Sequence, residues 1–189
     1  LGLVGENGAG KSTLMKILSG VYRADEGEIF IEGEKVLIDS VTKAHELGIS
    51  IIMQELNMCG HLSVADNIFI GRAHKKGLFI DDKKMHKEAQ KILDDLGIQL
   101  NTYTRVANLS IAQQQMVEIA KAISFHSKIL VLDEPTATLT EREIDQLFEI
   151  IKRLQEKDVG MVYISHRMAE LNRICCRATI IRDGQYIGT

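Results

Sequence analysis

The sequence predicts an α/β fold: a mainly parallel sheet with helices on both faces, a small antiparallel β part and an inserted helical subdomain. Short apolar runs without alternation, such as "LGLV" at residues 1–4 and "KILVL" at residues 128–132, are typical of strands buried on both faces of a sheet. Segments of helical periodicity alternate with these runs, which favours parallel strands joined through helices. At 189 residues with 45% hydrophobic side chains, the chain can form one packed domain with a subdomain inserted in it.

The first quarter of the chain alternates helices and strands that end at glycine residues. The pattern predicts a helix over residues 12–18, and Gly20 suits a left-handed cap after it. Residues 27–38 predict two strands hinged at a glycine, which form the antiparallel part. A short helix follows over residues 40–48, and residues 49–53 form another buried strand.

The middle of the chain is predicted to be helical. Ser63 begins one helix, and a second begins near Asp81. One face of the second helix carries Met85, Ala89, Ile92, Leu93 and Leu96. We therefore expect residues 55–124 to form a helical subdomain inserted in a core of residues 1–54 and 125–189.

The last third returns to alternating helices and strands. A helix over residues 141–157 is expected to bury Ile144, Leu147, Phe148, Ile151 and Leu154. A strand over residues 160–165 and a helix over residues 166–174 come next. Residues 178–188 predict a hairpin that turns on Asp183 and Gly184.

Composition excludes several classes of function. The net charge of -3 leaves no basic surplus for a nucleic-acid backbone, so no nucleic-acid partner is predicted. No apolar run approaches the roughly 20 residues that cross a bilayer, so a membrane role would be peripheral. We interpret Cys59, Cys175 and Cys176 as reduced thiols in a cytoplasm, although a redox switch at the vicinal pair is an alternative.

A phosphate-binding loop is the strongest motif. Residues 5–12 fit G-x-x-x-x-G-K-[ST] between a predicted strand and a predicted helix, the context of a P-loop NTPase. Its nucleotide-binding residues would be Gly5, Glu6, Asn7, Gly8, Ala9, Gly10, Lys11, Ser12 and Thr13. Backbone N–H groups and Lys11 would hold the phosphates, and Ser12 would bind Mg²⁺. A glycine turn with a solvated lysine is the alternative interpretation.

Four polar side chains follow predicted buried strands. Asp133 and Glu134 come after the strand "KILVL", Gln54 after "ISIIM", and His166 after "MVYIS". Asp133 would hold Mg²⁺, and Glu134 would polarise a water molecule. Each alone could be an ordinary polar residue at a strand end. Together with the loop they form the set that a γ-phosphate site needs.

A further helix begins at Ser110. The serine is expected to cap it, and an apolar face would comprise Ile111, Met116, Ile119, Ala120 and Ile123. A capped helix start is also a spare anion site, which one nucleotide bound to one chain does not need.

With these motifs in order, the sequence resembles the ATP-binding cassette family over nearly its whole length. "GENGAGKST" is similar to its Walker A loop, Gln54 to its Q-loop, "LSIAQ" to its signature, "ILVLDEP" to its Walker B strand and "YISH" to its switch-histidine segment. The segments "QQQMVEIAKAIS" and "GMVYISHRMAEL" are similar to the N-terminal cassette of bacterial monosaccharide importers of the ribose and galactose type.

The resemblance implies ATP and Mg²⁺ as cofactors and hydrolysis with Glu134 as general base. His166 would contact the γ-phosphate, and Gln54 would join the metal and water site to the helical insert. Ser110 would close over nucleotide bound to a second cassette, in the same chain or a dimer mate. It also implies membrane permease subunits as partners, a sugar-binding protein as an indirect one, and a peripheral place on the cytoplasmic face of the bacterial inner membrane.

The sequence departs from the family pattern in three ways. Ile111 and Ala112 replace two glycines of the signature, which keeps the N–H groups at a dihedral cost if Ala112 takes positive φ. Met53 stands where these cassettes often carry histidine, and residues 137–140 replace a loop that ends in Asp.

Two other functions are weighed against import. One is a non-transport cassette acting as a clamp in translation or DNA repair, and the other is a non-hydrolysing regulatory cassette. The early position of the phosphate loop also leads us to expect a truncated chain that lacks the strands, and the adenine-stacking aromatic residue, that precede the loop in the family.

Overall fold

The computed structural model describes residues 1–77 and 79–189, which form two compact units. The first unit comprises Leu1–Met53, Ser127–Pro135 and Asp158–Thr189, and the second comprises Gln54–His126 and Thr136–Lys157. The sequence placed the helix that begins at residue 141 in the core, whereas here it belongs to the second unit. Among the residues that the structure describes, every helix is too short or too polar to span a bilayer.

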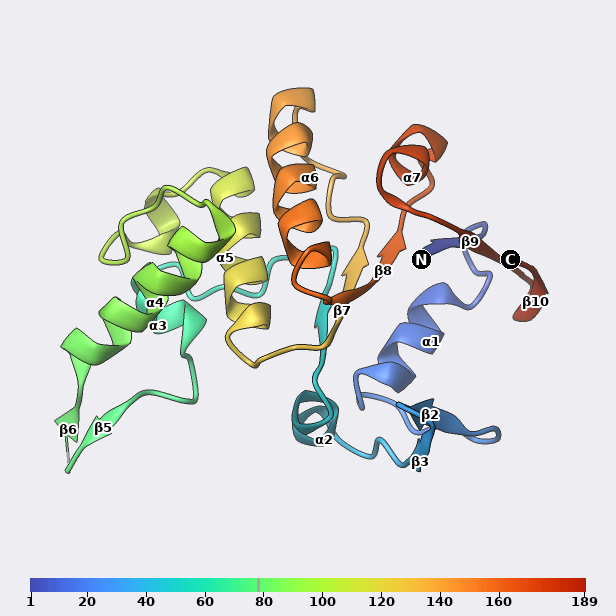
Figure 1. Ribbon diagram of the computed structural model, residues 1–189, viewed down its shortest axis with the longest axis horizontal. Coiled ribbons are helices and arrows are strands. Elements are labelled where there is room, and N and C mark those ends of the chain that lie inside the picture. The colour runs from blue at the N-terminus through green and yellow to red at the C-terminus, as the bar shows by residue number, and fades with distance from the viewer. Residues whose placement is uncertain (78) are drawn as a thin grey trace. The chain divides into compact units, whose positions relative to one another are not determined.

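A six-stranded sheet organises the first unit (Figure 1). Its strands are β1 (Gly2–Val4), β4 (Ile49–Ile52), β7 (Ile129–Asp133), β8 (Gly160–Ile164), β9 (Ala178–Arg182) and β10 (Gln185–Gly188). They lie in the order β10-β9-β1-β8-β7-β4, and only the β9–β10 pair is antiparallel. The predicted, mainly parallel sheet is confirmed. Because parallel strands end at one edge, the segments that follow β1, β7 and β8 meet there.

Three helices and a small hairpin complete the first unit. They are α1 (Lys11–Leu18), α2 (Val41–Glu46), α7 (Met168–Ile174) and the antiparallel pair β2 (Ile29–Ile31) and β3 (Glu34–Val36). Met15 of α1 packs with Leu3, Val131 and Ile164, which join α1 to β1, β7 and β8. This cluster fixes the start of α1 beside the sheet edge at which β1 ends.

The second unit consists mainly of helices. They are α3 (Val64–Ile68), α4 (Asp82–Leu96), the short 3-10 helix η1 (Val106–Asn108), α5 (Ile111–Ile123) and α6 (Glu141–Gln155). Ser63, Asp81 and Ser110 cap α3, α4 and α5 through their side chains, which confirms the predicted helix starts. The apolar face predicted for residues 141–157 is buried in α6.

Two features of this unit differ from expectation. Within the insert predicted to be helical, β5 (Lys75–Lys76) and β6 (Phe79–Ile80) pair as an antiparallel hairpin. In α5, Ile111 is 52% exposed rather than part of the core. Ala112 takes its place because it lies four and seven residues before Met116 and Ile119, on the same helix face.

The turn after α1 gives a test of the fold. Gly20 has φ +73°, and a Cβ there would lie 2.2 Å from the carbonyl oxygen of Ser40. Gly33 has φ +84°, but its Cβ would meet no atom within 4 Å. We expect Gly33→Ala to cost about 1–2 kcal/mol, the ordinary left-handed penalty, and Gly20→Ala clearly more, since backbone must also move. Urea unfolding of both variants measures the difference, and equal losses would contradict the predicted clash.

Candidate phosphate-binding and catalytic site

The loop between β1 and α1 has a backbone that only glycine can supply at three positions. Gly8 and Gly10 adopt φ values of +87° and +98°. Gly5 has an ordinary φ, but a Cβ there would lie 2.4 Å from the carbonyl oxygen of Ile181. Gly10 is also the residue immediately before α1, so the loop passes directly into the helix start. The predicted glycine-rich loop therefore has the shape that a helix-start anion site requires.

Lys11 places its ammonium group over this loop. Its Nζ donates hydrogen bonds to the carbonyl oxygens of Gly5 and Glu6, at 2.8 and 3.0 Å. Ser12 and Thr13 follow in the first turn of α1, where N–H groups have no acceptor within the helix. The cation, the helix start and the loop together suit a polyanion such as a triphosphate.

The β9–β10 turn supports the loop, a contact that sequence reasoning missed. The Gly184 N–H donates to the carbonyl of Ala9 at 3.1 Å, and the Ala9 N–H donates to the carbonyl of Glu6 at 3.1 Å. Asp183 and Gly184 have φ values of +51° and +76°, as the predicted tight turn demands. The residues Asp-Gly indicated a turn, but nothing in them indicated what the turn contacts.

Glu134 and His166 meet at the ends of β7 and β8. His166 Nδ1 lies 3.1 Å from Glu134 Oε1, and the Glu134 N–H donates to the carbonyl of Ile164 at 3.0 Å. The pairing of Asp133 with Ile164 sets this register. Glu134 has φ +47°, a strained conformation for a side chain of this size, and such strain concentrates at functional sites.

Asp133 carries a carboxylate that favours a nearby cation. Partial burial and the adjacent charge of Glu134 raise the pKa of Asp133, and Lys11 opposes them only in part. In the described part of the chain, no three His, Cys, Asp or Glu side chains gather as a metal cluster. A metal ion at Asp133 and Ser12 would thus take most ligands from phosphate and water. This donor set fits Mg²⁺, which keeps several waters and binds through few carboxylates.

Gln54 and Ser110 lie in the second unit, so their predicted roles at the nucleotide stay predictions. Ser110 Oγ accepts the Gln113 N–H at 3.3 Å, and Gln113 Oε1 accepts the Ser110 N–H at 3.0 Å. Ala112 has ordinary helical backbone in α5, so the dihedral cost considered for it does not arise.

A second feature missed from the sequence holds the segment that follows Gln54. The buried Asn67 of α3 accepts the Cys59 N–H at 2.8 Å and donates to the Cys59 carbonyl at 3.0 Å. Lys121 of α5 donates to the carbonyl of Asn57 at 3.4 Å. The segment is therefore tied to two helices of the second unit.

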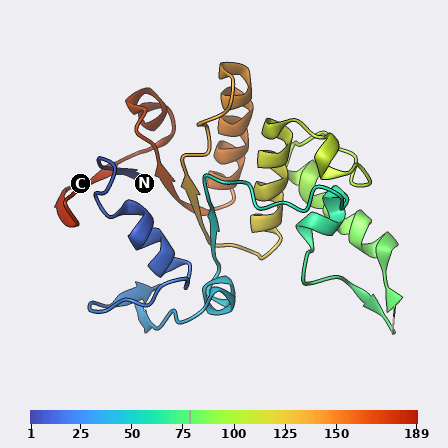
Figure 2. The same ribbon diagram turned by 180° about the vertical axis from the view of Figure 1, so that it is seen from behind.

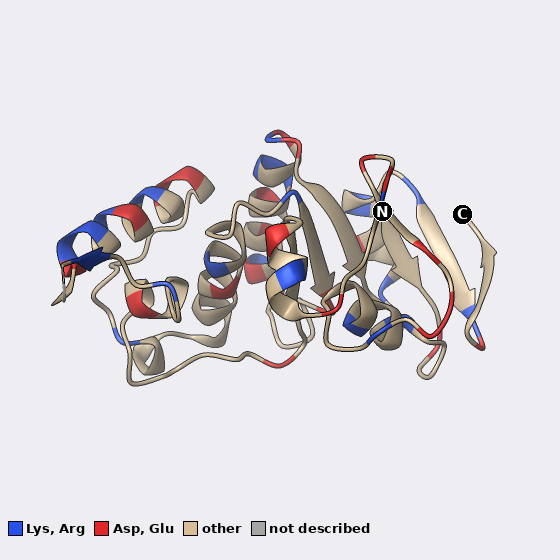
Figure 3. Cartoon of the chain, turned by 90° about the horizontal axis from the view of Figure 1, so that it is seen from below, with Lys and Arg blue, Asp and Glu red and all other residues tan. Residues whose placement is uncertain are grey.

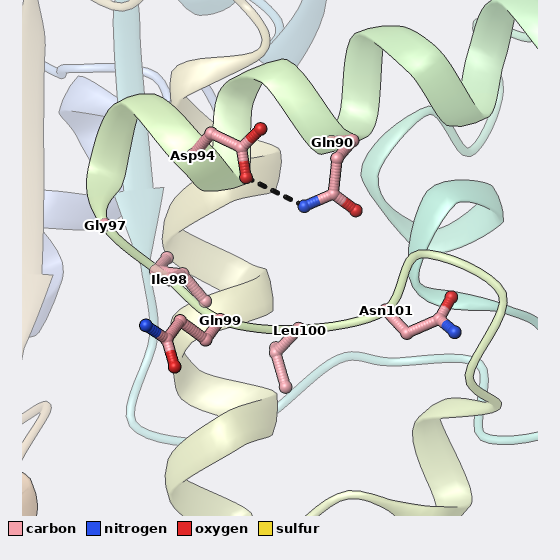
Figure 4. A pocket seen from close by; sticks show the side chains of 7 residues that line it. All are labelled: Gln90, Asp94, Gly97, Ile98, Gln99, Leu100 and Asn101. Carbon is pink, nitrogen blue, oxygen red and sulfur yellow. Dashed lines mark hydrogen bonds between the residues drawn. The ribbon is translucent and has the colours of Figure 1, made fainter.

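A hollow in the second unit is separate from the predicted nucleotide-binding residues. Figure 4 shows this hollow, which is lined by Gln90, Asp94 and residues 97–101. Gln90 Nε2 donates to Asp94 Oδ1 at 2.9 Å, so these two side chains satisfy each other. None of the residues predicted to bind nucleotide lies in its lining.

Comparison with known proteins gives one consistent result. Residues 1–137 match the protein family described as ABC transporter. The galactose/methyl galactoside import ATP-binding protein MglA of Clostridium perfringens strain 13 is 52% identical over 187 residues, which cover 99% of this chain and 36% of that protein. MglA of Escherichia coli K12 is 49% identical over 187 residues, which cover 99% and 37%.

Two further matches extend this result. A putative ribose/galactose/methyl galactoside import ATP-binding protein of Albidiferax ferrireducens is 52% identical over 189 residues, covering 99% of this chain and 38% of that protein. The chain thus spans between 36% and 38% of the length of these curated relatives. Among solved structures, the ADP conformation of MJ1267, an ATP-binding cassette of an ABC transporter, superposes with a TM-score of 0.85 at 26% identity, covering 99% of this chain and 78% of that one.

The raised pKa of Asp133 predicts a stability effect. The folded chain disfavours the ionised form of Asp133, so ionisation of this carboxyl group lowers the stability of the fold. This cost in folding free energy is fully present above the raised pKa of the folded state. The cost disappears as pH falls through the raised pKa toward the ordinary pKa of an unfolded aspartate. Without metal at pH 7.5, Asp133→Asn should therefore melt a few degrees higher than the unsubstituted chain, and the gap should shrink at pH 4.5.

Thermal unfolding in EDTA at both pH values measures this effect. Asp25→Asn, at an exposed position of the same unit, is the control and should leave the melting temperature unchanged. A lower melting temperature for Asp133→Asn at pH 7.5 would contradict the inferred cost.

Proposed function

Because this chain belongs to the ABC transporter family, we propose that it binds ATP with Mg²⁺ and hydrolyses it as the ATP-binding part of a bacterial monosaccharide importer. The observation that carries the catalytic part is the contact between Glu134 and His166, 3.1 Å apart beside the metal-binding carboxylate. The names of the relatives support galactose and ribose as the class of sugar. They favour import over a clamp in translation or DNA repair.

Binding is proposed to rest on the first turn of α1 and the loop before it. Lys11 exchanges its two carbonyl acceptors, at Gly5 and Glu6, for oxygens of the terminal phosphates. Asp133 and Ser12 would hold Mg²⁺, which when bound neutralises charge on the phosphates. The desolvated Asp133 carboxylate loses its unfavourable environment in the same step.

Hydrolysis is proposed to depend on Glu134 as general base. Its carboxylate takes the proton of the attacking water while the oxygen of that water bonds to the γ-phosphorus. The bond between this phosphorus and the β–γ bridging oxygen breaks in the same displacement, so ADP leaves with the bonding electrons and phosphate is released. The hydrogen bond from His166 orients the carboxylate and leaves one of its oxygens for the water. His166 is 67% exposed at its side chain, so the ring is accessible to the γ-phosphate that the proposal places beside it.

Coupling between the nucleotide site and the membrane permease is proposed to run through the second unit. Gln54 would respond to the metal and the water, and the contacts of Asn67 and Lys121 support transfer from its segment to α3 and α5. Ser110 would close over nucleotide on a second cassette. Membrane permease subunits would bind the insert of residues 55–124 on the cytoplasmic face of the membrane, and a sugar-binding protein would act through them. The intact set of Lys11 and the catalytic residues speaks against a non-hydrolysing regulatory cassette.

Replacing the base separates chemistry from binding. Glu134→Gln should keep ATP affinity within a few-fold but lower phosphate release by about 10²- to 10⁴-fold, because an amide cannot accept the proton. Lys11→Ala is the contrasting variant and should weaken ATP binding itself, since it removes the charge on the phosphates. Calorimetry with Mg²⁺ and a phosphate-release assay measure both quantities. Turnover by Glu134→Gln close to that of the unsubstituted protein would remove Glu134 from this role.

Ser110 can be tested through pairing of cassettes. In a Glu134→Gln background, Ser110→Arg should leave ATP binding unchanged but abolish ATP-driven dimerisation, because the contact is made to the partner's nucleotide. Ser110→Ala removes the same helix cap, at about 1 kcal/mol, without adding bulk, and should still dimerise. Light scattering with and without ATP reports the outcome. If both variants dimerise alike, Ser110 acts only as a cap.

A further inference from the structure

The β5–β6 hairpin exposes apolar side chains outside any core. Phe79 is 80% exposed and Ile80 is 60% exposed. The two strands pair with each other and, among the described residues, with no other strand. Figures 1 and 2 show the hairpin extending from the start of α4, away from α5. These two adjacent apolar side chains on a projecting element are accessible to something outside the chain.

The register places a cation beside each apolar side chain. Lys75 lies opposite Ile80, and Lys76 lies opposite Phe79. Directly opposed residues of an antiparallel pair share one face, and successive residues alternate faces. Each face of the hairpin therefore carries one apolar side chain next to one lysine.

The adjoining turns of α4 add more positive charge. Between residues 75 and 87 the chain has five lysines against two aspartates, although the whole chain has a net charge of -3. Figure 3 shows this blue concentration at the left of the picture. Both aspartates are engaged: Asp81 accepts the Lys84 N–H at 3.1 Å, and Asp82 lies 3.5 Å from His86 Nε2.

Most of these lysines form no ion pair with a described carboxylate. No described carboxylate lies within ion-pair distance of the ammonium groups of Lys75, Lys76, Lys83 or Lys87. Lys84 has one partner, Glu88, at 3.8 Å. All five are exposed. The surface formed by Lys75, Lys76, Phe79, Ile80, Lys83, Lys84 and Lys87 is called the basic hairpin surface below.

The first unit contains a hairpin of opposite charge. The β2–β3 pair exposes Phe30 by 58%, and Leu37, just after it, is 71% exposed. Residues 25–36 carry five carboxylates against one lysine, Lys35, which pairs with Glu28. Exposed apolar side chains thus occur on both hairpins, and only one of them combines these with free cations.

We propose that the basic hairpin surface binds anionic phospholipid membranes directly. Phe79 and Ile80 would enter the headgroup boundary while the flanking lysines contact lipid phosphates. Each lysine near an anionic surface contributes about fivefold in affinity, and a short apolar element alone binds only marginally, so both signals are needed. A bilayer requires no shaped groove from its partner, which suits two apolar side chains on a narrow ribbon. The surface belongs to the second unit, whereas the nucleotide-binding loop belongs to the first, and its binding does not depend on ATP.

A tryptophan reporter tests the insertion. The chain contains no tryptophan, so Phe79→Trp creates a single probe, and Phe30→Trp creates its matched control on the acidic hairpin. Vesicles of equal parts phosphatidylglycerol and phosphatidylcholine, without nucleotide, should shift the emission of Phe79→Trp to shorter wavelength and leave Phe30→Trp unchanged. Vesicles of phosphatidylcholine alone should shift neither, and 500 mM NaCl should reverse the shift.

Vesicle co-sedimentation tests the individual groups. Phe79→Ser with Ile80→Ser, and separately Lys75→Glu with Lys76→Glu, should lower binding to the anionic vesicles at least tenfold, whereas Phe30→Ser with Leu37→Ser should leave it within about twofold. Circular dichroism confirms that each variant is folded. Failure of the unsubstituted chain to sediment, binding that survives both hairpin pairs, or an equal shift from both tryptophans would overturn the proposal. An acidic protein partner would then be the occupant to test.

Discussion

The site depends on the close approach of two backbone segments, the loop at Gly5 and the strand at Ile181. The carbonyl of Ile181 occupies the space that a Cβ would need at Gly5, and the Gly184 N–H holds the same loop through Ala9. The loop is thus fixed between β1 and the β9–β10 turn before any ligand binds. Lys11 and the first turn of α1 follow directly from it, so their positions are determined by backbone contacts rather than by flexible side chains.

The register of the sheet determines what faces this loop. Pairing of β7 with β8 aligns Asp133 with Ile164, so Glu134, one residue beyond β7, meets His166, two residues beyond β8. The left-handed backbone of Glu134 and the desolvated carboxylate of Asp133 both cost stability. Buried strands such as β7, with three consecutive fully buried residues, support that cost.

Local chemistry made much of the fold predictable. Caps at Ser40, Ser63 and Ser110 and left-handed glycines such as Gly20 set most element ends, and each signal involves only neighbouring residues. The β5–β6 hairpin was not predictable because strands of two residues show no periodicity. Ile111 was misassigned because the first residue of a helix has no preceding turn to fix its face.

Tertiary geometry explains what the sequence could not supply about the site. The residue types at positions 11, 133, 134 and 166 indicated phosphate and metal chemistry, since each follows a strand or a glycine loop. The hydrogen bond between Glu134 and His166 joins residues 32 apart and exists only because β7 and β8 are neighbours in one register. A shift of one strand by one residue would turn its own side chains to the other face of the sheet and separate the two groups. The catalytic proposal therefore rests on strand pairing as much as on the residues themselves.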